Sequence, residues 1–167
     1  MCIRDRYQDG TALNIDDSTL SGNTAQFGGA IINWTTMTLS DSTVTLNTST
    51  GGAGAGLYNN VGTATIGNSI LSANVGSFDC AGPATYVTNG YNYRGATCTG
   101  LAAGTDVNGA APNLAALANN GGFTTTHLPN VGSPVIGTGN PACSGTDQRG
   151  LARPQGGTCD KGAVDRA

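Results

Sequence analysis

The sequence is poor in charge and in the side chains that favour helices. Charged residues make up 10% of the 167 residues, glutamate does not occur, and Lys161 is the only lysine. Because Glu and Lys are strong helix formers, their scarcity argues against a helical fold. The net charge of −3 offers nothing to neutralise a run of phosphates, which argues against a nucleic-acid partner. No run of about 18 apolar residues occurs, so we expect no membrane-spanning helix.

An apolar signal-peptide core is missing from the first ten residues, MCIRDRYQDG. Arg4, Asp5 and Arg6 are concentrated in a chain that otherwise has little charge, and MCIRDR resembles a translated sequencing adapter. We therefore interpret residues 1–10 as a non-native or disordered leader and exclude them, with Cys2, from the fold. We expect the chain to be a C-terminal fragment whose signal peptide lies outside it.

Glycine and small polar residues are abundant where charged and helix-favouring residues are scarce. Glycine alone accounts for 27 residues, and threonine, serine and asparagine are abundant. Thr, Val and Ile fit pleated, half-buried strands, whereas Gly and Asn are typical of turns. The composition therefore predicts an all-β chain with many turns.

The first half of the chain repeats one pattern. Residues 13–23, 37–47 and 64–74 each read apolar-x-apolar-x-x-Ser-x-apolar-x-x-Asn, and their first residues are 24 and 27 positions apart. Glycine-rich segments, residues 28–33 and 54–59, follow the first two copies. A repeat this short cannot bury its own apolar face, so it is typical of a solenoid in which neighbouring units share one core.

Stacking of these units predicts a right-handed parallel β-helix. The alternation within each unit makes it a strand, and its apolar residues face inward: Leu13, Ile15, Leu39 and Ile66 among them. Stacked strands lie about 4.8 Å apart, so equivalent residues form columns. We expect about three rungs in residues 11–77, with two polar columns: Ser18, Ser42 and Ser69, and Asn23, Asn47 and Asn74. A leucine-rich repeat and a β-sandwich fit this pattern less well.

The repeat fades after residue 76, and residues 78–167 are expected to form the last rung and an irregular cap over the open end of the core. Two cysteine pairs, 18 and 16 residues apart, flank glycine-rich stretches, and we predict a local disulfide in each: Cys80–Cys98 and Cys143–Cys159. Persistent disulfides indicate an oxidising, extracytoplasmic location. Residues 111–120 are the one segment for which we expect a short helix or helical turn.

The end of the chain carries a family resemblance. Residues 113–165 contain the following matching groups: Ala118 to Gly122 (ANNGG), Thr126-His127, Gly132-Ser133-Pro134, Thr146 to Gly150 (TDQRG), Arg153-Pro154 and Gly162-Ala163. This segment resembles the choice-of-anchor Q domain of bacterial right-handed β-helix repeat proteins. It departs from that family at Ile136 to Gly139, which read Ile-Gly-Thr-Gly in place of Ile-Asp-Ala-Gly. The resemblance implies export and attachment to the cell surface, and it implies no particular activity.

One acidic column is a candidate site. The repeat stacks Asp17, Asp41 and Asn68, with Asp16 beside them. Lyases on this fold use clustered carboxylates to hold calcium and a basic side chain to remove a proton, and calcium requires six to eight oxygen ligands. Asp16, Asp17 and Asp41 are therefore candidate calcium ligands, and Asp17, Asp41 and Arg149 are candidate catalytic residues. The alternative is that Asp and Asn occupy these turn positions for backbone reasons alone.

Other polar and aromatic residues also have two interpretations. Arg149 and Arg153 lie near Asp147, where they form either a substrate clamp or ion pairs that pin the cap to the last rung. His127 is either a general base or a histidine bonded to backbone. The aromatic residues that could stack on sugar rings, or equally belong to the core and its edges, are Trp34, Tyr58, Tyr91 and Tyr93.

These patterns favour a monomeric, extracellular or cell-surface module without catalytic activity, whose long β-face contacts a polysaccharide or another surface component. One alternative is a calcium-dependent polysaccharide lyase or glycoside hydrolase, and another is a purely structural cap of a longer surface protein. An acid cluster with a nearby arginine on one face would favour the enzyme. A flat face lined by Thr and Asn, with exposed aromatic residues, would favour binding.

Overall fold

The computed structural model describes residues 12–98, 100–109 and 111–166. The leader predicted for residues 1–10, with Cys2, lies outside this part of the chain. The described residues form strands and irregular segments without a helix. The strands are β1 (Leu13–Asp16), β2 (Thr19–Ser21), β3 (Thr24–Phe27), β4 (Ile31–Asn33), β5 (Met37–Ser40), β6 (Thr43–Thr45), β7 (Thr48–Ala53), β8 (Leu57–Asn59), β9 (Thr63–Gly67), β10 (Ile70–Leu71), β11 (Cys80–Ala81), β12 (Thr85–Gly90), β13 (Tyr93–Arg94) and β14 (Val107–Asn108).

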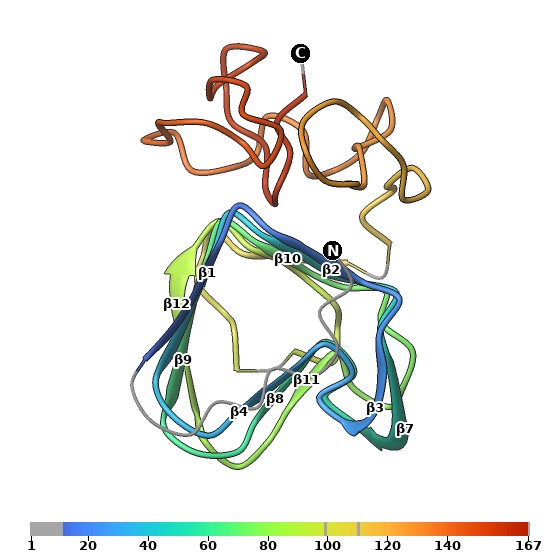
Figure 1. The fold of residues 1–167 in the computed structure, drawn as a ribbon. Coiled ribbons are helices and arrows are strands. Elements are labelled where there is room, and N and C mark those ends of the chain that lie inside the picture. The colour runs from blue at the N-terminus through green and yellow to red at the C-terminus, as the bar shows by residue number, and fades with distance from the viewer. Residues whose placement is uncertain (1–11, 99, 110, 167) are drawn as a thin grey trace.

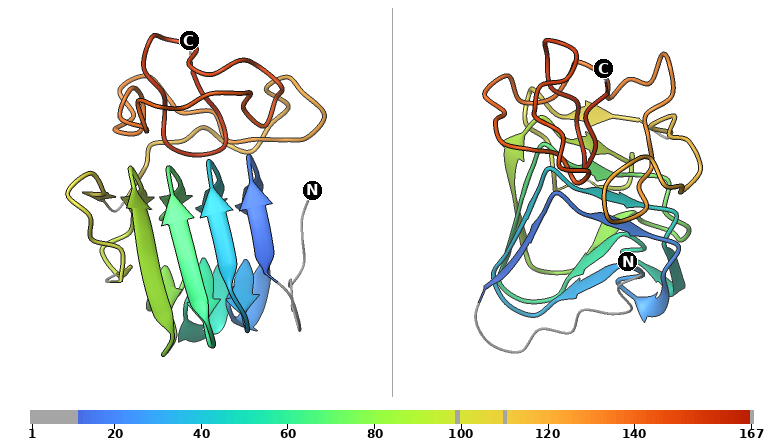
Figure 2. Two further views of the ribbon diagram at one scale, coloured as in Figure 1. Left: turned by 90° about the vertical axis from the view of Figure 1, so that its left-hand side faces the viewer. Right: turned by 45° about the horizontal axis from the view of Figure 1, so that its top comes forward.

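The strands stack into a right-handed parallel β-helix, as the repeat predicts. The sheets have the orders β1-β5-β9-β12, β14-β13-β10-β6-β2, β11-β8-β4 and β3-β7, and every pairing between these strands is parallel. In Figure 1 the chain runs clockwise from β1 through β2 and β3 to β4, and each later rung lies further from the viewer. Figure 2 shows the four strands of the first sheet side by side.

The strand register reproduces the offsets of the repeat. Leu13 pairs with Met37 and Met37 with Ala64, while Ile15 pairs with Leu39 and Leu39 with Ile66. These residues are buried and belong to one apolar core inside the solenoid. Because burial of each large aliphatic side chain contributes about 1.5–3 kcal/mol, this column of apolar side chains fixes the register.

The two predicted polar columns are present as hydrogen-bonded ladders. The Nδ2 of Asn23 donates to the Oδ1 of Asn47 (2.9 Å), and the Nδ2 of Asn47 donates to the Oδ1 of Asn74 (2.9 Å). Asn74 continues the ladder to the carboxylate of Asp79 (2.9 Å). In the serine column, the backbone N–H of each serine donates to the hydroxyl of the next: Ser18 to Ser42 (3.1 Å) and Ser42 to Ser69 (3.2 Å). Buried polar turns are thereby satisfied within the stack.

A short segment closes the C-terminal end of the solenoid. Cys98 and Leu101 are buried and pack in the main core, and the disulfide between Cys80 and Cys98 joins this segment to β11, with 4.6 Å between the two Cα atoms. In Figure 1 the chain after β13 crosses the interior of the last rung. This segment therefore covers the open end of the apolar core, and the remaining C-terminal residues are not required to cover it.

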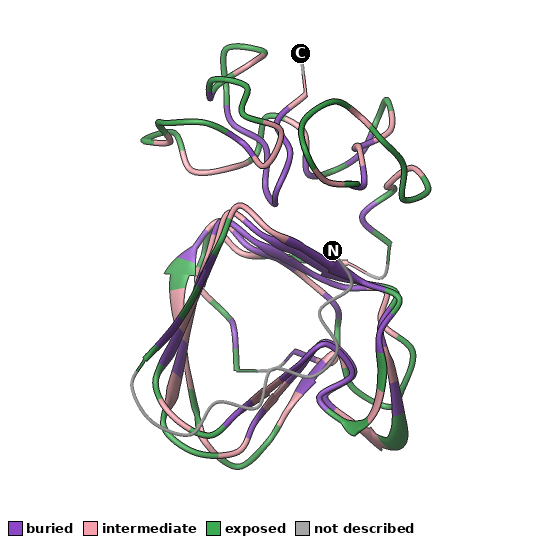
Figure 3. Cartoon of the chain, viewed as in Figure 1, coloured by how far each residue is buried: buried purple, intermediate pink, exposed green. Residues whose placement is uncertain are grey.

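Residues 111–166 lie instead along one flank of the solenoid, and we call them the C-terminal lobe. They cover the outer face of the sheet that contains β2, β6 and β10 across its rungs (Figures 1 and 2). A second apolar cluster of Ile70, Tyr93 and Val135, with Leu114 against it, fills the interface. Strands β2, β6 and β10 are therefore buried on both faces (Figure 3). The lobe is irregular and contains the predicted disulfide between Cys143 and Cys159.

The helix expected in residues 111–120 is absent, and this prediction was wrong. Leu114 and Ala118 form antiparallel bridges with Pro129 and Thr126 instead. Asn113 has a φ of 51°, which interrupts a helix at its start. The backbone of Ala118 exchanges hydrogen bonds with Thr126 (3.1 and 3.0 Å), so the returning chain supplies the partners that helical turns would have supplied. In the described part of the chain we find no helix that could span a membrane.

Candidate functional site

The acidic column lies at one corner of the solenoid, where each rung turns from the first sheet to the second. Asp17, Asp41 and Asn68 occupy the turns after β1, β5 and β9, with φ values of 41°, 46° and 47°. This left-handed conformation favours Asn and Asp over other residues that carry a Cβ, because their short polar side chains bond locally. Backbone geometry therefore accounts for the residue type at each position, as the turn interpretation predicts.

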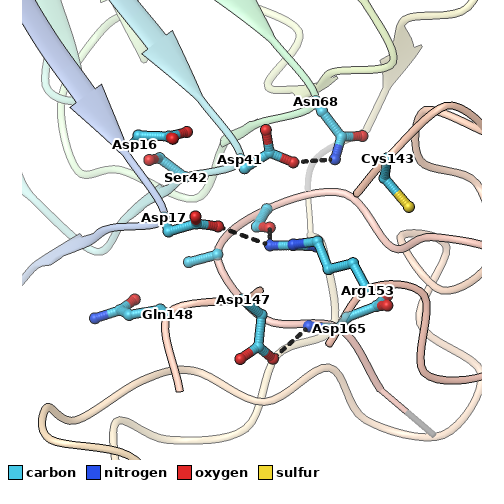
Figure 4. Close-up of polar contacts among 12 residues, drawn as sticks. Asp16, Asp17, Asp41, Ser42, Asn68, Cys143, Asp147, Gln148, Arg153 and Asp165 are labelled. Carbon is cyan, nitrogen blue, oxygen red and sulfur yellow. Dashed lines mark hydrogen bonds and ion pairs between the residues drawn. The ribbon is translucent and has the colours of Figure 1, made fainter. Parts of the chain in front are cut away.

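The column forms contacts both within the solenoid and with the C-terminal lobe (Figure 4). Asn68 donates its Nδ2 to the Oδ1 of Asp41 (2.7 Å), and the hydroxyl of Ser40 donates to the Oδ1 of Asp16 (2.7 Å). The guanidinium of Arg153, which belongs to the lobe, lies 3.3 Å from Asp17 through its Nη2. The fold thus brings Asp16, Asp17 and Asp41 together, with an arginine that lies far away in sequence.

The covered corner changes the acidity of its carboxyl groups. Burial raises the pKa of Asp17 to about 6, although the charge of Arg153 opposes this shift. Burial also raises the pKa of Asp41, against the hydrogen bond from Asn68. A carboxyl group with a pKa near 6 can hold or release a proton close to neutral pH, which is a property that catalysis requires.

The side chains of the two arginines near the acidic corner are both largely buried and bonded within the protein, and only Arg153 reaches the corner. The side chain of Arg153 is only 1% exposed and donates to the carbonyl of Gly162 (2.8 Å) as well as to Asp17. Arg149, the candidate catalytic base, donates its Nε and Nη2 to Asp147 (2.9 and 2.7 Å) and a further bond to the Asp165 carbonyl. The Asp147–Arg149 pair is therefore internal to the lobe. Arg153 pins the lobe to the first rung, where we had expected the last.

Calcium does not fit the acidic corner as it stands. Within the described residues, no group of three or more His, Cys, Asp or Glu side chains is arranged to hold a metal ion. Asp16, Asp17 and Asp41 each accept a hydrogen bond through Oδ1, which leaves three of their six carboxylate oxygens, fewer than the six to eight that calcium requires. The side chain of Asp41 is also bonded to Asn68, and that of Asp17 faces a buried guanidinium.

His127 has a side-chain partner that sequence reasoning missed. Its Nε2 lies 2.8 Å from the hydroxyl of Ser21, and its Nδ1 lies 2.7 Å from the Ala115 carbonyl. Since a carbonyl only accepts, Nδ1 carries a proton, and in the neutral imidazole Nε2 is then the atom that accepts from Ser21. Both residues are buried, and a cavity of about 250 Å³ beside them is lined by His127 but not by Ser21. The pair joins the lobe to β2, and Ser21 falls at a variable position of the repeat, so no sequence signal marks it.

The solenoid keeps two flanks that the lobe leaves uncovered (Figure 1). The first is the outer face of β1, β5, β9 and β12, where Asn14, Thr38, Thr65 and Val87 lie in register and are exposed or half-buried. The second is the side with β3, β4 and β8, where the predicted aromatic residue Tyr58 lies in β8 and Trp34 follows β4. The other two predicted tyrosines are not on these flanks: Tyr93 is buried with its hydroxyl bonded to the Ala111 carbonyl (2.9 Å), and Tyr91 packs against Lys161.

Comparison of the chain with protein-family models, with curated proteins and with solved structures finds no match.

Proposed function

We propose that the protein is an extracytoplasmic surface module that contacts glycans through the flanks that its C-terminal lobe leaves uncovered. The observation that carries this proposal is the uncovered sheet of β1, β5, β9 and β12. It displays Asn14, Thr38 and Thr65 in one column and Ser40 beside it, on a flat face (Figure 2). Hydroxyl and amide groups at regular spacing of about 4.8 Å offer donors and acceptors to the hydroxyls of a sugar chain.

Two further observations support the location. The two disulfides are typical of proteins that fold in an oxidising compartment. The resemblance of residues 113–165 to the choice-of-anchor Q domain agrees with export and attachment to a cell surface. Adhesion is the role that a rigid, glycan-contacting solenoid in this location would perform.

The proposal is tested by binding of the oxidised protein to a panel of immobilised neutral and acidic polysaccharides. A double variant, Thr38→Arg with Thr65→Arg, places bulky charged groups on the flat face. It should weaken polysaccharide binding or change which polysaccharides are bound. The matched control is Ala142→Arg with Ser144→Arg, which adds the same charge at exposed positions of the lobe. If the wild-type protein retains no polysaccharide of the panel, the glycan proposal is wrong and a purely structural role is favoured.

A lyase or glycoside hydrolase is the second candidate, favoured by the convergence of Asp16, Asp17 and Asp41 and by the raised pKa of Asp17. Glycosidases place two carboxyl groups about 5–9 Å apart, which stacked rungs allow. Because Arg149 and Arg153 are both engaged, we expect no ultraviolet absorbance from unsaturated products on pectate or alginate, with or without calcium. A calcium-dependent rise that Asp17→Ala with Asp41→Ala abolishes would establish the enzyme instead.

A further inference from the structure

Two aromatic rings, Phe27 and Tyr58, pack together on the side of the solenoid away from the lobe, and Trp34 directly follows the neighbouring strand β4. We call Phe27, Trp34 and Tyr58 the aromatic patch. Phe27 ends β3. Tyr58 lies in the middle of β8, in register with the outward-facing Ile32 of β4. Phe27 and Trp34 are 41% and 42% exposed, and Tyr58 is half-buried. Aromatic side chains on a soluble protein are usually more buried, so a group of them at one surface indicates a binding site.

Contacts within the solenoid order the Phe27–Tyr58 ring pair and the turn that carries Trp34. The Phe27 and Tyr58 rings have centroids 5.5 Å apart, at an angle of 42°. Gly51 lies against the Phe27 ring, since a Cβ at residue 51 would lie 3.2 Å from Phe27 Cε1. Trp34 stands at a turn that Asn33 fixes, because the Asn33 side chain donates to the Thr35 carbonyl (2.6 Å) and accepts from the Thr35 N–H (3.2 Å). Pre-organised rings lose little conformational entropy on binding.

The surroundings of the patch are polar and uncharged. From residue 18 to residue 78 the sequence contains a single charged residue, Asp41, which lies in the turn between β5 and β6 at the lobe-covered corner. Gln26, Thr50 and Asn60, whose side chains are exposed or half-buried, flank the patch along the chain. Residues 18–78, all of which the structure describes, give this surface ring faces and hydrogen-bonding groups, and they add no charge to it that would attract an acidic polymer or a basic peptide.

We infer that the aromatic patch binds a neutral polysaccharide, whose pyranose rings stack on Phe27, Trp34 and Tyr58. This inference rests on the proposed glycan contact and adds a ring-stacking surface on the second uncovered flank, with a ligand class for it. The apolar face of a sugar ring matches an aromatic face, and the ring hydroxyls at its edge reach the amide and hydroxyl groups beside the patch. Uronic polymers carry a carboxylate on each ring and find no cationic partner among residues 18–78 of the described chain.

Trp34 provides a direct readout, because it is the only tryptophan of the chain. The oxidised protein is titrated with a soluble neutral β-glucan and, in parallel, with polygalacturonate, while the tryptophan fluorescence is recorded. Binding at the patch should shift the emission to shorter wavelength with the neutral polymer, and added salt should leave the affinity unchanged. Phe27→Ala keeps the reporter and should weaken binding about three- to tenfold.

The control is Phe123→Ala, which removes a fully exposed aromatic ring from the lobe, outside the patch. Its affinity for the β-glucan should equal that of the wild type, and circular dichroism should show that both variants are folded. Retention of the protein on β-glucan in a native gel extends the test to Trp34→Ala, which should migrate freely. If glycan binding survives both Phe27→Ala and Trp34→Ala, or occurs only with polygalacturonate and weakens with salt, the patch is not the site although the glycan proposal stands. If no polysaccharide binds, both proposals fail together, and an apolar protein surface becomes the alternative occupant of the patch.

Discussion

At the residue scale, Asp17 shows how one side chain serves the backbone and the interface at once. Its left-handed φ of 41° favours Asp or Asn at this turn. The lobe then covers the corner, and burial raises the pKa of the carboxyl group to about 6 even though Arg153 lies beside it. The neutral acid is therefore the form that the folded protein prefers around slightly acidic pH. This preference reflects the covering of the corner and needs no bound substrate.

Replacement of Asp17 by Asn tests whether protonation of Asp17 stabilises the folded protein. The unfolded group has a pKa of about 3.9, so a folded value near 6 means that the folded protein binds the proton more tightly. The Asp17 carboxyl group then stabilises the folded protein at low pH, and this contribution to the free energy of unfolding is lost as the pH rises from about 4 to about 6. Asp17→Asn, which mimics the neutral acid, should melt like the wild type at about pH 4 and at a higher temperature at about pH 7.5. A lower melting temperature at the higher pH would mean that attraction to Arg153 outweighs desolvation.

Asp147 has a pKa shift opposite in direction to that of Asp17, so the pH dependence of its stabilising effect should also be opposite. Burial disfavours its charged form, but hydrogen bonds from Arg149 and from the backbone N–H groups of Asp165 and Leu151 outweigh burial and lower its pKa. The contribution of the Asp147 carboxylate to the stability of the fold should be present above about pH 4 and disappear as the pH falls below that value. Asp147→Asn should therefore destabilise the protein at neutral pH and converge with the wild type in acid, as thermal unfolding across pH would show.

At the scale of the structural element, periodicity made the solenoid predictable. Inward-facing apolar residues, the Ser and Asn columns and the parallel register all follow from a pattern that recurs every 24 or 27 residues. A periodic signal is averaged over several copies, so tertiary context does not override it easily. By contrast, residues 111–120 contain helix-compatible alanines and leucines in a single copy. Their structure depends on a partner strand that returns from residue 126, which local sequence does not reveal.

The asparagine ladder should be a major source of stability in each rung. Asn47 is fully buried, and its side chain contacts Asn23, Asn74 and the carbonyls of Leu20 (2.9 Å) and Thr45 (3.0 Å). Asn47→Ala leaves several of these buried groups without partners, each at about 1–3 kcal/mol, and should lower the free energy of unfolding by about 2–4 kcal/mol. Asn14→Ala, on the exposed face of β1, should change it by less than about 0.5 kcal/mol. Equal losses in urea unfolding of the two variants would contradict a structural role for the ladder.

At the scale of the whole molecule, the lateral position of the lobe decides which surfaces remain for binding. The lobe reaches the first rung through Gln148 and His127, which contact Thr19 (2.6 Å) and Ser21 (2.8 Å) from more than 100 positions away in sequence. None of these contacts recurs with the repeat, so no pattern pointed to them. The same contacts placed Arg153 beside Asp17 and left the aromatic patch open on another side. The candidate acids could thus be named from sequence, whereas their burial and their arginine partner could not.

The docking of the lobe onto the solenoid depends on the absence of a side chain at Gly162. The N–H of Gly162 donates to the Asn68 carbonyl (2.8 Å), and the next N–H, that of Ala163, donates to the hydroxyl of Thr43 (3.1 Å). A Cβ at residue 162 would lie 2.7 Å from both Ile70 Cδ1 and Thr43 Oγ1. Both of these side chains are buried and cannot move aside easily. The lobe can therefore approach the sheet this closely only with glycine at this position.

Gly157 allows the effect of close approach to be separated from backbone strain. Gly162 and Gly157 have similar φ values, 94° and 90°, but a Cβ at residue 157 would meet no atom within 4 Å. Alanine at either position incurs the strain of a left-handed backbone, about 1–2 kcal/mol. Gly162→Ala should lose about 1–3 kcal/mol more, because overpacking forces the lobe away from β6 and β10. Limited proteolysis should then release the lobe of this variant while the solenoid resists. Equal stability and equal protease resistance of the two variants would show that the lobe is not held by close packing at this glycine, and that polar contacts such as Arg153 to Asp17 hold it instead.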